Sequence, residues 1–417
     1  MFDVLVNDVL STPAILIGLF VLLGNLLLKR SITDTIAGTF KTIIGFTLLN
    51  LGASIAADTL NNFSEMFTEA FGLQAAVMNT DAYGALLNDT FGVTPIIMIG
   101  GIILNLVIAK YTRFKYIFLT GQIALYMSGT LALVLHSFHP LITIIVGSIL
   151  LSLYMAISPA LLQKYTTNII GSNDFGIASS GSLSYFLAAK IGEWIGDKEK
   201  SVEDIKVPKA LGFLQDSTVS MSLTMTILFI FISFFTGSTF IEEQLSNGQN
   251  YLFFSFMQGI TFAAGIQILL TGINMAIDEL IPAFRGIAEK LIDGAIPSLD
   301  APVLAKYSPN AMIIGFLSSL AAGILGMFLL SFTRLPVIIP GMLQHFFIGG
   351  VAATYANSTG GRRGAIVAPF VTGLFMAFLP SIFLVFVGHG LSNTVVFGDT
   401  DLTLMGILLE AITQLFK

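Results

Sequence analysis

Long apolar stretches with almost no charged residues dominate this sequence. Of its 417 residues, 55% are hydrophobic and 11% are charged, whereas soluble domains carry about 25% charged residues. A helix that spans a bilayer needs about 20 mostly apolar residues. About eleven stretches meet this requirement, the last of them short: 13–28, 35–57, 93–109, 116–135, 139–160, 218–241, 251–277, 311–331, 336–356, 364–388 and 402–416. The sequence therefore predicts an all-α polytopic membrane protein.

Several kinds of chemistry are excluded by what the sequence lacks. There is no Cys, so a disulfide, a thiolate metal site and a cysteine nucleophile are ruled out. A phosphate-binding GxxxxGK[ST] motif is absent, and His136 and His139 do not have the spacing of a metal site. No cluster of basic and aromatic residues indicates nucleic-acid binding, and the first residues show no cleavable signal pattern. We expect no cofactor, no metal and no nucleic-acid partner.

The distribution of Lys and Arg predicts how the chain is oriented. Basic residues concentrate on the cytoplasmic side of membrane proteins. If the N-terminus lies outside and the C-terminus in the cytoplasm, all basic residues except Arg334 fall inside, and the outside loop 57–92 contains acidic residues but no basic one. Segments 161–217 and 278–310 must then begin and end at the cytoplasmic face, which predicts two re-entrant hairpins.

Two pairs of similar stretches indicate an internal repeat. "GFTLLNLGASIAADTL" (45–60) resembles "GIQILLTGINMAIDEL" (265–280) at an offset of 220, and "YTRFKYIFLTG" (111–121) resembles "FTRLPVIIPG" (332–341). Because an odd number of helices separates the copies, the two halves should have inverted topology, as in many transporters. Arg334 would then be the outside copy of Arg113. The alternative is a chance match between Gly/Leu-rich helices.

The stretch "LIDGAIPSLDAPVLAKYSPNA" (291–311) contains three prolines around Asp300 and predicts the tip of one hairpin. Irregular backbone at membrane depth survives where it lines a cavity or packs in protein. Asp300 would accept hydrogen bonds from substrate hydroxyls or, alternatively, act as a helix N-cap or lie in a solvated turn. Gln122 would contact a polyol through its amide or form a structural bond between helices. Ser179 and Ser180 would lie at the tip of the other hairpin or in a flexible loop.

Three further features allow a functional and a structural interpretation. His345 and Glu410 would form a proton relay, or serve as a packing histidine with satisfied ring nitrogens and an interface glutamate. The charged stretch "GDKEKSVEDIKVPKALG" (196–212) would dock a soluble partner, or be a solvated loop.

Five stretches, spread in order along the chain, resemble one family: "KTIIGFTLLNLG" (41–52), "KEKSVEDIKVP" (198–208), "FRGIAEKLIDGA" (284–295), "YSPNAMIIGF" (307–316) and "VIIPGMLQHFF" (337–347). They are similar to the membrane-embedded EIIC component of the ascorbate-type sugar phosphotransferase system, the SgaT/UlaA family. The resemblance implies a homodimer in the bacterial cell membrane. It also implies a V-motif dimerisation domain (1–60 and 218–282) and a core domain (61–217 and 283–417) that moves across the membrane.

The same resemblance implies a separate EIIB protein, charged by an upstream EIIA, whose phosphocysteine phosphorylates the arriving sugar. Of the family's site residues, the acid of the second hairpin matches Asp300. Gln122 stands at the family's His position, and Ala178, Ser179 and Ser180 replace a Gly-His-Gln stretch. A family Gln aligns with Met127 or Tyr126.

Vectorial uptake of a small carbohydrate (an ascorbate-like sugar acid, a sugar or a polyol) is the function we expect. Whether the chain counts as an enzyme is left open, since it would be the membrane subunit of a phosphotransferase complex with no phosphorylated residue of its own. The alternatives are an ion-coupled secondary transporter that works without EIIB, and a membrane receptor or scaffold that transports nothing.

Overall fold

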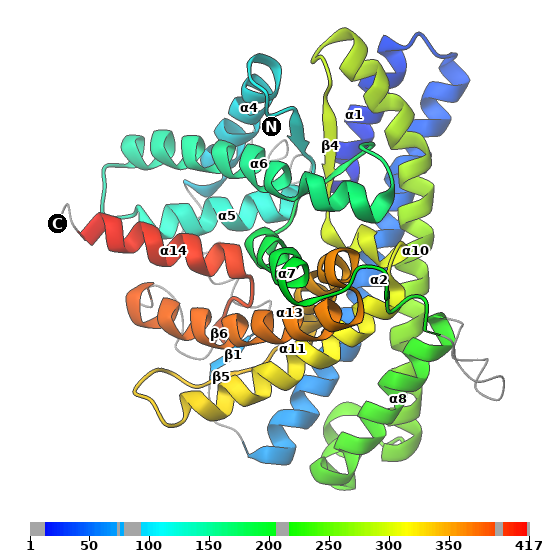
Figure 1. Ribbon diagram of the computed structural model, residues 1–417, viewed down its shortest axis with the longest axis vertical. Helices are drawn as coiled ribbons and strands as arrows, with labels where there is room; N and C mark the ends of the chain where they lie inside the picture. The colour runs from blue at the N-terminus through cyan, green and yellow to red at the C-terminus, as the bar shows by residue number, and fades with distance from the viewer. Residues whose placement is uncertain (1–12, 73–75, 79–92, 206–216, 388–394, 415–417) are drawn as a thin grey trace.

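The computed structural model describes residues 13–72, 76–78, 93–205, 217–387 and 395–414, and these are mostly helical. Figure 1 shows the arrangement. The helices are α1 Pro13–Leu27, α2 Ile32–Phe71, α4 Thr94–Tyr111, α5 Gly121–Val134, α6 Pro140–Ile170, α7 Ser182–Ile195, α8 Ser217–Thr236, α9 Ser238–Phe240, η3 Ile241–Leu245, α10 Tyr251–Lys290, η4 Ala301–Lys306, α11 Pro309–Leu330, α12 Met342–Gln344, η5 His345–Gly349, α13 Gly350–Val387 and α14 Thr400–Thr413.

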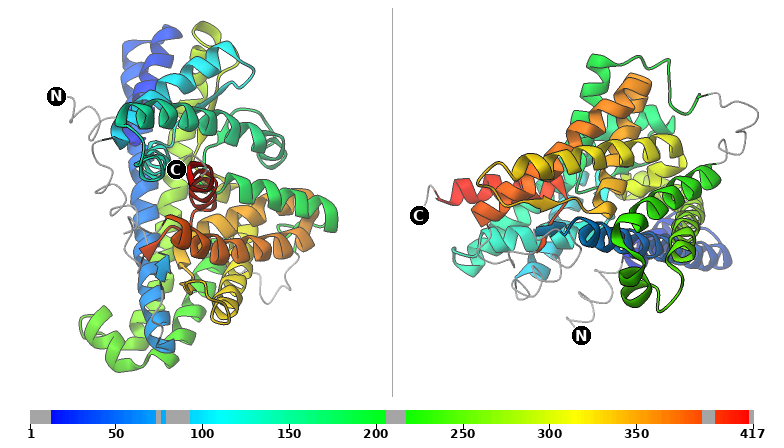
Figure 2. Two further views of the ribbon diagram at one scale, coloured as in Figure 1. Left: turned by 90° about the vertical axis from the view of Figure 1, so that its left-hand side faces the viewer. Right: turned by 90° about the horizontal axis from the view of Figure 1, so that it is seen from below.

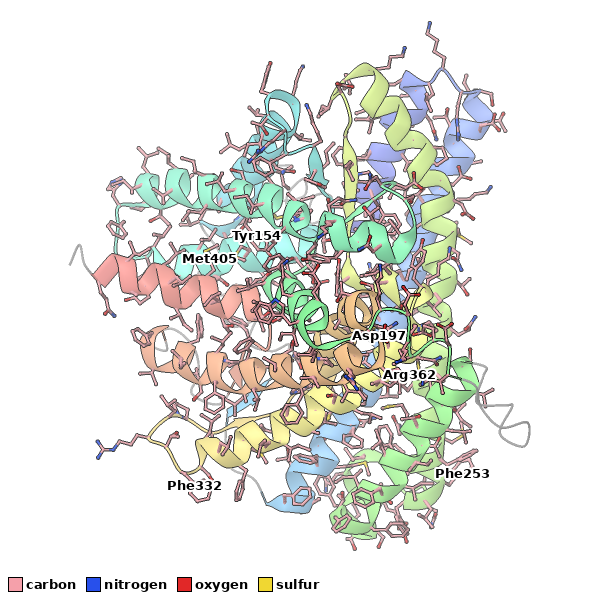
Figure 3. All side chains as sticks on the ribbon, viewed as in Figure 1. Tyr154, Asp197, Phe253, Phe332, Arg362 and Met405 are labelled. Atoms are coloured by element: carbon pink, nitrogen blue, oxygen red, sulfur yellow. The ribbon has the colours of Figure 1, made fainter. Side chains whose placement is uncertain are left out.

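Among the described residues, six helical stretches are long and apolar enough to cross a membrane. The segment 221–245 would add a seventh, although it bends by 111° next to Gly237, while α1 and α5 contain apolar helices below that length. Large apolar side chains are exposed over the surface, such as Phe253 (53%) and Phe332 (74%), which Figure 3 labels at the periphery. These features agree with an all-α membrane protein, and the count of about eleven spans stays a prediction.

Helices α2 and α10 are the longest elements of the structure, with 40 residues each. At 1.5 Å per residue each is about 60 Å long, roughly twice the hydrocarbon thickness of a bilayer. The apolar stretches that end at residues 57 and 277 are therefore parts of longer helices. Asp58, Glu65 and Glu69 lie on one exposed face of α2 rather than in a loop, because a helix can continue beyond the segment that must be apolar.

Four glycines let α2 and α10 pack backbone to backbone along the long axis of the molecule (Figures 1 and 2). A Cβ on Gly52 would lie 2.4 Å from the carbonyl oxygen of Gly265, and one on Gly272 would lie 2.4 Å from that of Gly45. The contact is reciprocal: the first glycine of each stretch meets the second glycine of the other. These four residues come from the two similar stretches 45–60 and 265–280.

Short parallel strands join segments that are far apart in the sequence. One sheet has the order β2-β4-β3 and the other the order β5-β1-β6. The strands are β1 Ala76–Met78, β2 Tyr116–Phe118, β3 Gly176–Ile177, β4 Ile296–Leu299, β5 Ile338–Ile339 and β6 Val395–Val396. The middle strands β1 and β4 begin at residues 76 and 296, again 220 positions apart. Each middle strand pairs with two strands of the opposite half of the chain.

The charged segment after α7 is attached to the helices beside it. The Val202 amide donates to Oδ1 of Asn357 (3.0 Å), and the Glu203 carboxylate accepts the Ala311 amide at the start of α11 (2.8 Å). Gly361, at φ 55° and ψ −145°, interrupts α13 where a Cβ would lie 2.2 Å from the Asp197 carbonyl oxygen. Asp197 and Arg362 are neighbours in Figure 3. Residues 206–212 of the expected docking loop lie outside the described residues.

Replacing Gly52 by Leu should destabilise the protein by about 3 kcal/mol or more, because the new side chain would meet the α10 backbone, which cannot move aside alone. The measurement is the thermal unfolding of the purified protein in detergent. Ser54→Leu, on the exposed face of the same helix, is the matched control and should change the unfolding free energy by less than about 0.5 kcal/mol. Equal melting temperatures for both variants would contradict the close packing of α2 and α10.

Candidate functional site

One cavity of about 220 Å³ brings together residues from six separate segments of the chain. Its walls come from α2, α5, the turn after β3, the turn after β4, the stretch from α12 into η5, and the turn before α14. All five candidate residues of the sequence analysis line it: Gln122, Tyr126, Ser179, Ser180 and Asp300. A smaller pocket of about 20 Å³, which also contains Gln122 and Asp300, extends from it toward α1. Cavities that collect polar groups in an apolar wall are the usual places for small ligands.

The parallel strands β2, β4 and β3 bring two turns to the cavity. Parallel strands run in the same direction, so their carboxyl ends meet at one edge of the sheet. The Ala178 amide donates to the Leu299 carbonyl (2.7 Å), and the Thr120 hydroxyl donates to the Ala178 carbonyl (3.2 Å). Backbone groups that could not find water in a membrane are paired in this way. The turn 178–181 and the turn 300–302 are thus held side by side.

Asp300 has the N-cap position that the structural interpretation expects, and its role toward a substrate stays a prediction. It is the N-cap of η4, where its carboxylate accepts the Ala301 amide (2.7 Å), and Pro302 stands in the first turn of that short helix. The same carboxylate also lines the cavity. One hydrogen bond from the protein leaves acceptor capacity on the carboxylate for a ligand.

Gln122 and Tyr126 lie one turn apart on α5 and contact each other. The Gln122 amide donates to the Tyr126 hydroxyl (2.7 Å), so its observed bond is within one helix and not between helices. Of the two residues that align with the family Gln, Tyr126 lines the cavity, whereas Met127 is fully buried and does not. This pair presents an amide carbonyl and a phenol oxygen from one wall.

The sequence analysis missed two acidic residues at the start of α14, Asp399 and Asp401. Asp399 lines the cavity and accepts a hydrogen bond from the Ser180 hydroxyl. Asp401 caps the N-terminus of α7, because its carboxylate accepts the amides of Ser182 (2.9 Å) and Leu183 (3.0 Å). The repeat offset of 220 could have identified Asp399 from the sequence. It relates the candidate Ser179, in the turn before α7, to position 399, in the turn before α14.

Tyr154 of α6 connects the same elements. Its hydroxyl lies 2.6 Å from the Ser179 carbonyl oxygen and 3.1 Å from Oδ2 of Asp401. Figure 3 labels this side chain at the level of α6 and α14. The turn 178–181 is therefore fixed by α6 on one side and by the start of α14 on the other, which limits the positions its serine hydroxyls can take.

His345 and Glu410 do not line this cavity. His345 is fully buried in the π-helical turn η5, and neither ring nitrogen has a hydrogen-bond partner among the described residues. Glu410 is buried and bonds with Thr413 (3.2 Å) and Gln414 (3.4 Å) of its own helix. The burial of His345 agrees with a packing role, but the expectation that its ring nitrogens are satisfied is wrong within the described residues. The position of Glu410 at the membrane interface stays a prediction.

Comparison with known proteins identifies a family of membrane permeases that the chain resembles. A family model for the EIIC-GAT group, described as "PTS system sugar-specific permease component", matches residues 8–401. The chain is also similar to the "Ascorbate-specific PTS system EIIC component" of Mycoplasma pneumoniae (strain ATCC 29342 / M129 / Subtype 1). The two are 26% identical over 452 aligned residues, which cover 94% of this chain and 67% of the relative.

Asp401→Ala should lower the stability of the protein by about 1–2 kcal/mol, because two amides at the start of α7 lose their cap. The readout is the melting temperature of the purified protein. Asp174→Ala removes an exposed carboxylate from the segment between α6 and β3 and should leave the melting temperature unchanged. If both variants melt at the wild-type temperature, the Asp401 cap does not stabilise the turn.

Proposed function

Because the chain belongs to the EIIC-GAT family of PTS sugar-specific permease components, we propose that it binds a small carbohydrate in the cavity between its two turns. It carries this substrate inward across the cell membrane and presents it for phosphorylation by a separate EIIB protein. The single observation that supports this assignment is the cavity itself, which joins Asp300, Gln122 and Ser180 from three distant segments. Carboxylate, amide and hydroxyl groups together can pair with several substrate hydroxyls.

The chain contributes positioning rather than a nucleophile. It contains no Cys, so the phosphocysteine must belong to EIIB, which an upstream EIIA would charge. Holding a substrate hydroxyl in a fixed orientation, away from bulk water, is the contribution expected of the membrane subunit. Segment 196–212 is our candidate for the EIIB contact, with the exposed side chains of Lys198 and Lys200 in its described part.

Transport would occur by an elevator movement of the core domain (61–217 and 283–417) against a dimerising V-motif domain (1–60 and 218–282). Two observations support the inverted repeats on which this division into two domains is based. The glycines of α2 and α10 contact each other reciprocally, as two copies around a pseudo-two-fold axis would. The strand orders β2-β4-β3 and β5-β1-β6 also interconvert when each strand is exchanged for its counterpart about 220 residues away, which follows the transporter pattern of inverted repeats.

Phosphorylation of the transported molecule tests the function. We expect membrane vesicles that contain the chain to accumulate a labelled sugar or polyol as its phosphate ester, and only when EIIB, EIIA and a phosphoryl donor are supplied. L-Ascorbate and a panel of hexitols and hexoses are the probes. Accumulation of the free molecule under an ion gradient without EIIB would instead establish the secondary transporter. Binding without any accumulation would establish the receptor.

Site-directed labelling tests the inverted repeat. Since the chain has no Cys, a single introduced cysteine can be labelled without background. Arg334→Cys should react with a membrane-impermeant maleimide added to intact cells, whereas Arg113→Cys should react only after permeabilisation. Both positions are exposed, so accessibility to the reagent is matched. Labelling of both from the same side would contradict the opposite orientation of the two copies.

A further inference from the structure

We propose that Asp399 is a second acidic substrate ligand beside Asp300, and that the two carboxylates select an uncharged polyhydroxylated molecule over an anion such as ascorbate. The proposal rests on the proposed function only in taking the cavity as the substrate site. It adds a specificity residue from a segment, the turn before α14, that the sequence analysis did not include. It also names a chemical class of substrate that differs from the one in the name of the Mycoplasma pneumoniae relative.

Two hydrogen bonds with Ser180, one involving Asp399 and one involving Asp401, fix the turn that carries Asp399. The chain leaves β6, buries Phe397, and reaches the cavity just before α14 begins at Thr400. The Asp401 amide donates to the Ser180 carbonyl (2.8 Å), while the Ser180 hydroxyl donates to the Asp399 carboxylate. The turn before α14 is therefore attached to the turn before α7, and both contribute to the same wall of the cavity.

The charged side chains that line the cavity are all acidic. Asp300 and Asp399 line it, and none of its lining residues among those described is Lys, Arg or His. The ion pairs found in the described part of the chain involve neither carboxylate. Like charges brought together where water is scarce repel strongly. An anionic ligand would meet this repulsion, whereas the hydroxyl groups of a neutral polyol can donate to both carboxylates.

A second observation points to a neutral polar ligand. The side chain of Gln344 lines the cavity and is 7% exposed, and its amide forms no hydrogen bond with any described residue. The amide of Gln344 is therefore available to a ligand in the cavity, and a ligand hydroxyl can pair with either its oxygen or its nitrogen. The π-helical turn η5 begins at the next residue, and such turns are frequent at functional sites.

Direct binding to the purified full-length protein tests the proposal without EIIB. The probes are L-ascorbate at neutral pH, where it is an anion, and a panel of hexitols, pentitols and hexoses, each measured by thermal shift and then by calorimetry. At least one neutral probe should bind, with a Kd at least tenfold lower than that of ascorbate. Asp399→Asn should lower the Kd of ascorbate at least threefold and raise that of the neutral ligand. Asp293→Asn, an exposed carboxylate seven residues before Asp300, should change neither.

Asp300→Asn gives an independent test if Asp399→Asn does not fold, because Asn is an equally good N-cap. It should shift the two Kd values in the same directions. The proposal is overturned if ascorbate binds the wild type more tightly than every neutral probe, if no neutral probe binds, or if both amide variants weaken ascorbate binding. A neutral probe that binds but is never phosphorylated would contradict the phosphotransferase function alone, so the two failures can be told apart.

Discussion

Pairing of backbone groups away from water is the constraint on which this structure depends. Within a bilayer an unpaired amide or carbonyl costs several kcal/mol, which favours uninterrupted helices. The described part of the chain nevertheless contains six short strands, and their backbone groups are paired in two three-stranded parallel sheets. Each sheet takes its middle strand from the opposite half of the sequence. The two halves are therefore interlocked, and the extended segments exchange their hydrogen bonds with one another.

The same sheets place the polar residues of the cavity. Pairing in the sheet fixes the position of each strand's carboxyl end. The residues that follow the strand can then cap a helix or face the cavity. Asp300 follows β4 and caps η4, while Asp399 follows β6 and bonds to the turn after β3. Asp401 and Tyr154 then fix that turn through the start of α7 and α6. Rigid elements of this kind hold a binding site more precisely than a free loop would.

Function and specificity are separable in this architecture. The family match covers residues 8–401, which is nearly the whole chain. The polar groups of the cavity occupy a few positions, some in turns (Ser179, Ser180, Asp300) and some on helices (Gln122, Tyr126, Gln344), and function generally depends on such sites rather than on the fold that carries them. A buried site that matches each hydroxyl with a partner discriminates strongly between related molecules. The departures from the family pattern that the resemblance implies at Gln122, Ser179 and Ser180 would therefore bear on the substrate rather than on the fold.

The sequence by itself determined the membrane class, the family and five residues of the cavity, because hydropathy, proline placement and motif similarity are local properties. Asp300 could be identified from the sequence because an acidic residue between prolines in an apolar segment is unusual, whatever residues contact it in the fold. Only the tertiary structure decided that α2 and α10 extend past their apolar parts, that Glu410 is buried, and that Asp399 and Gln344 join the cavity. Those facts arise from contacts between residues far apart in the chain, such as Ser180 with Asp399, and no local pattern encodes which distant segment will supply the partner.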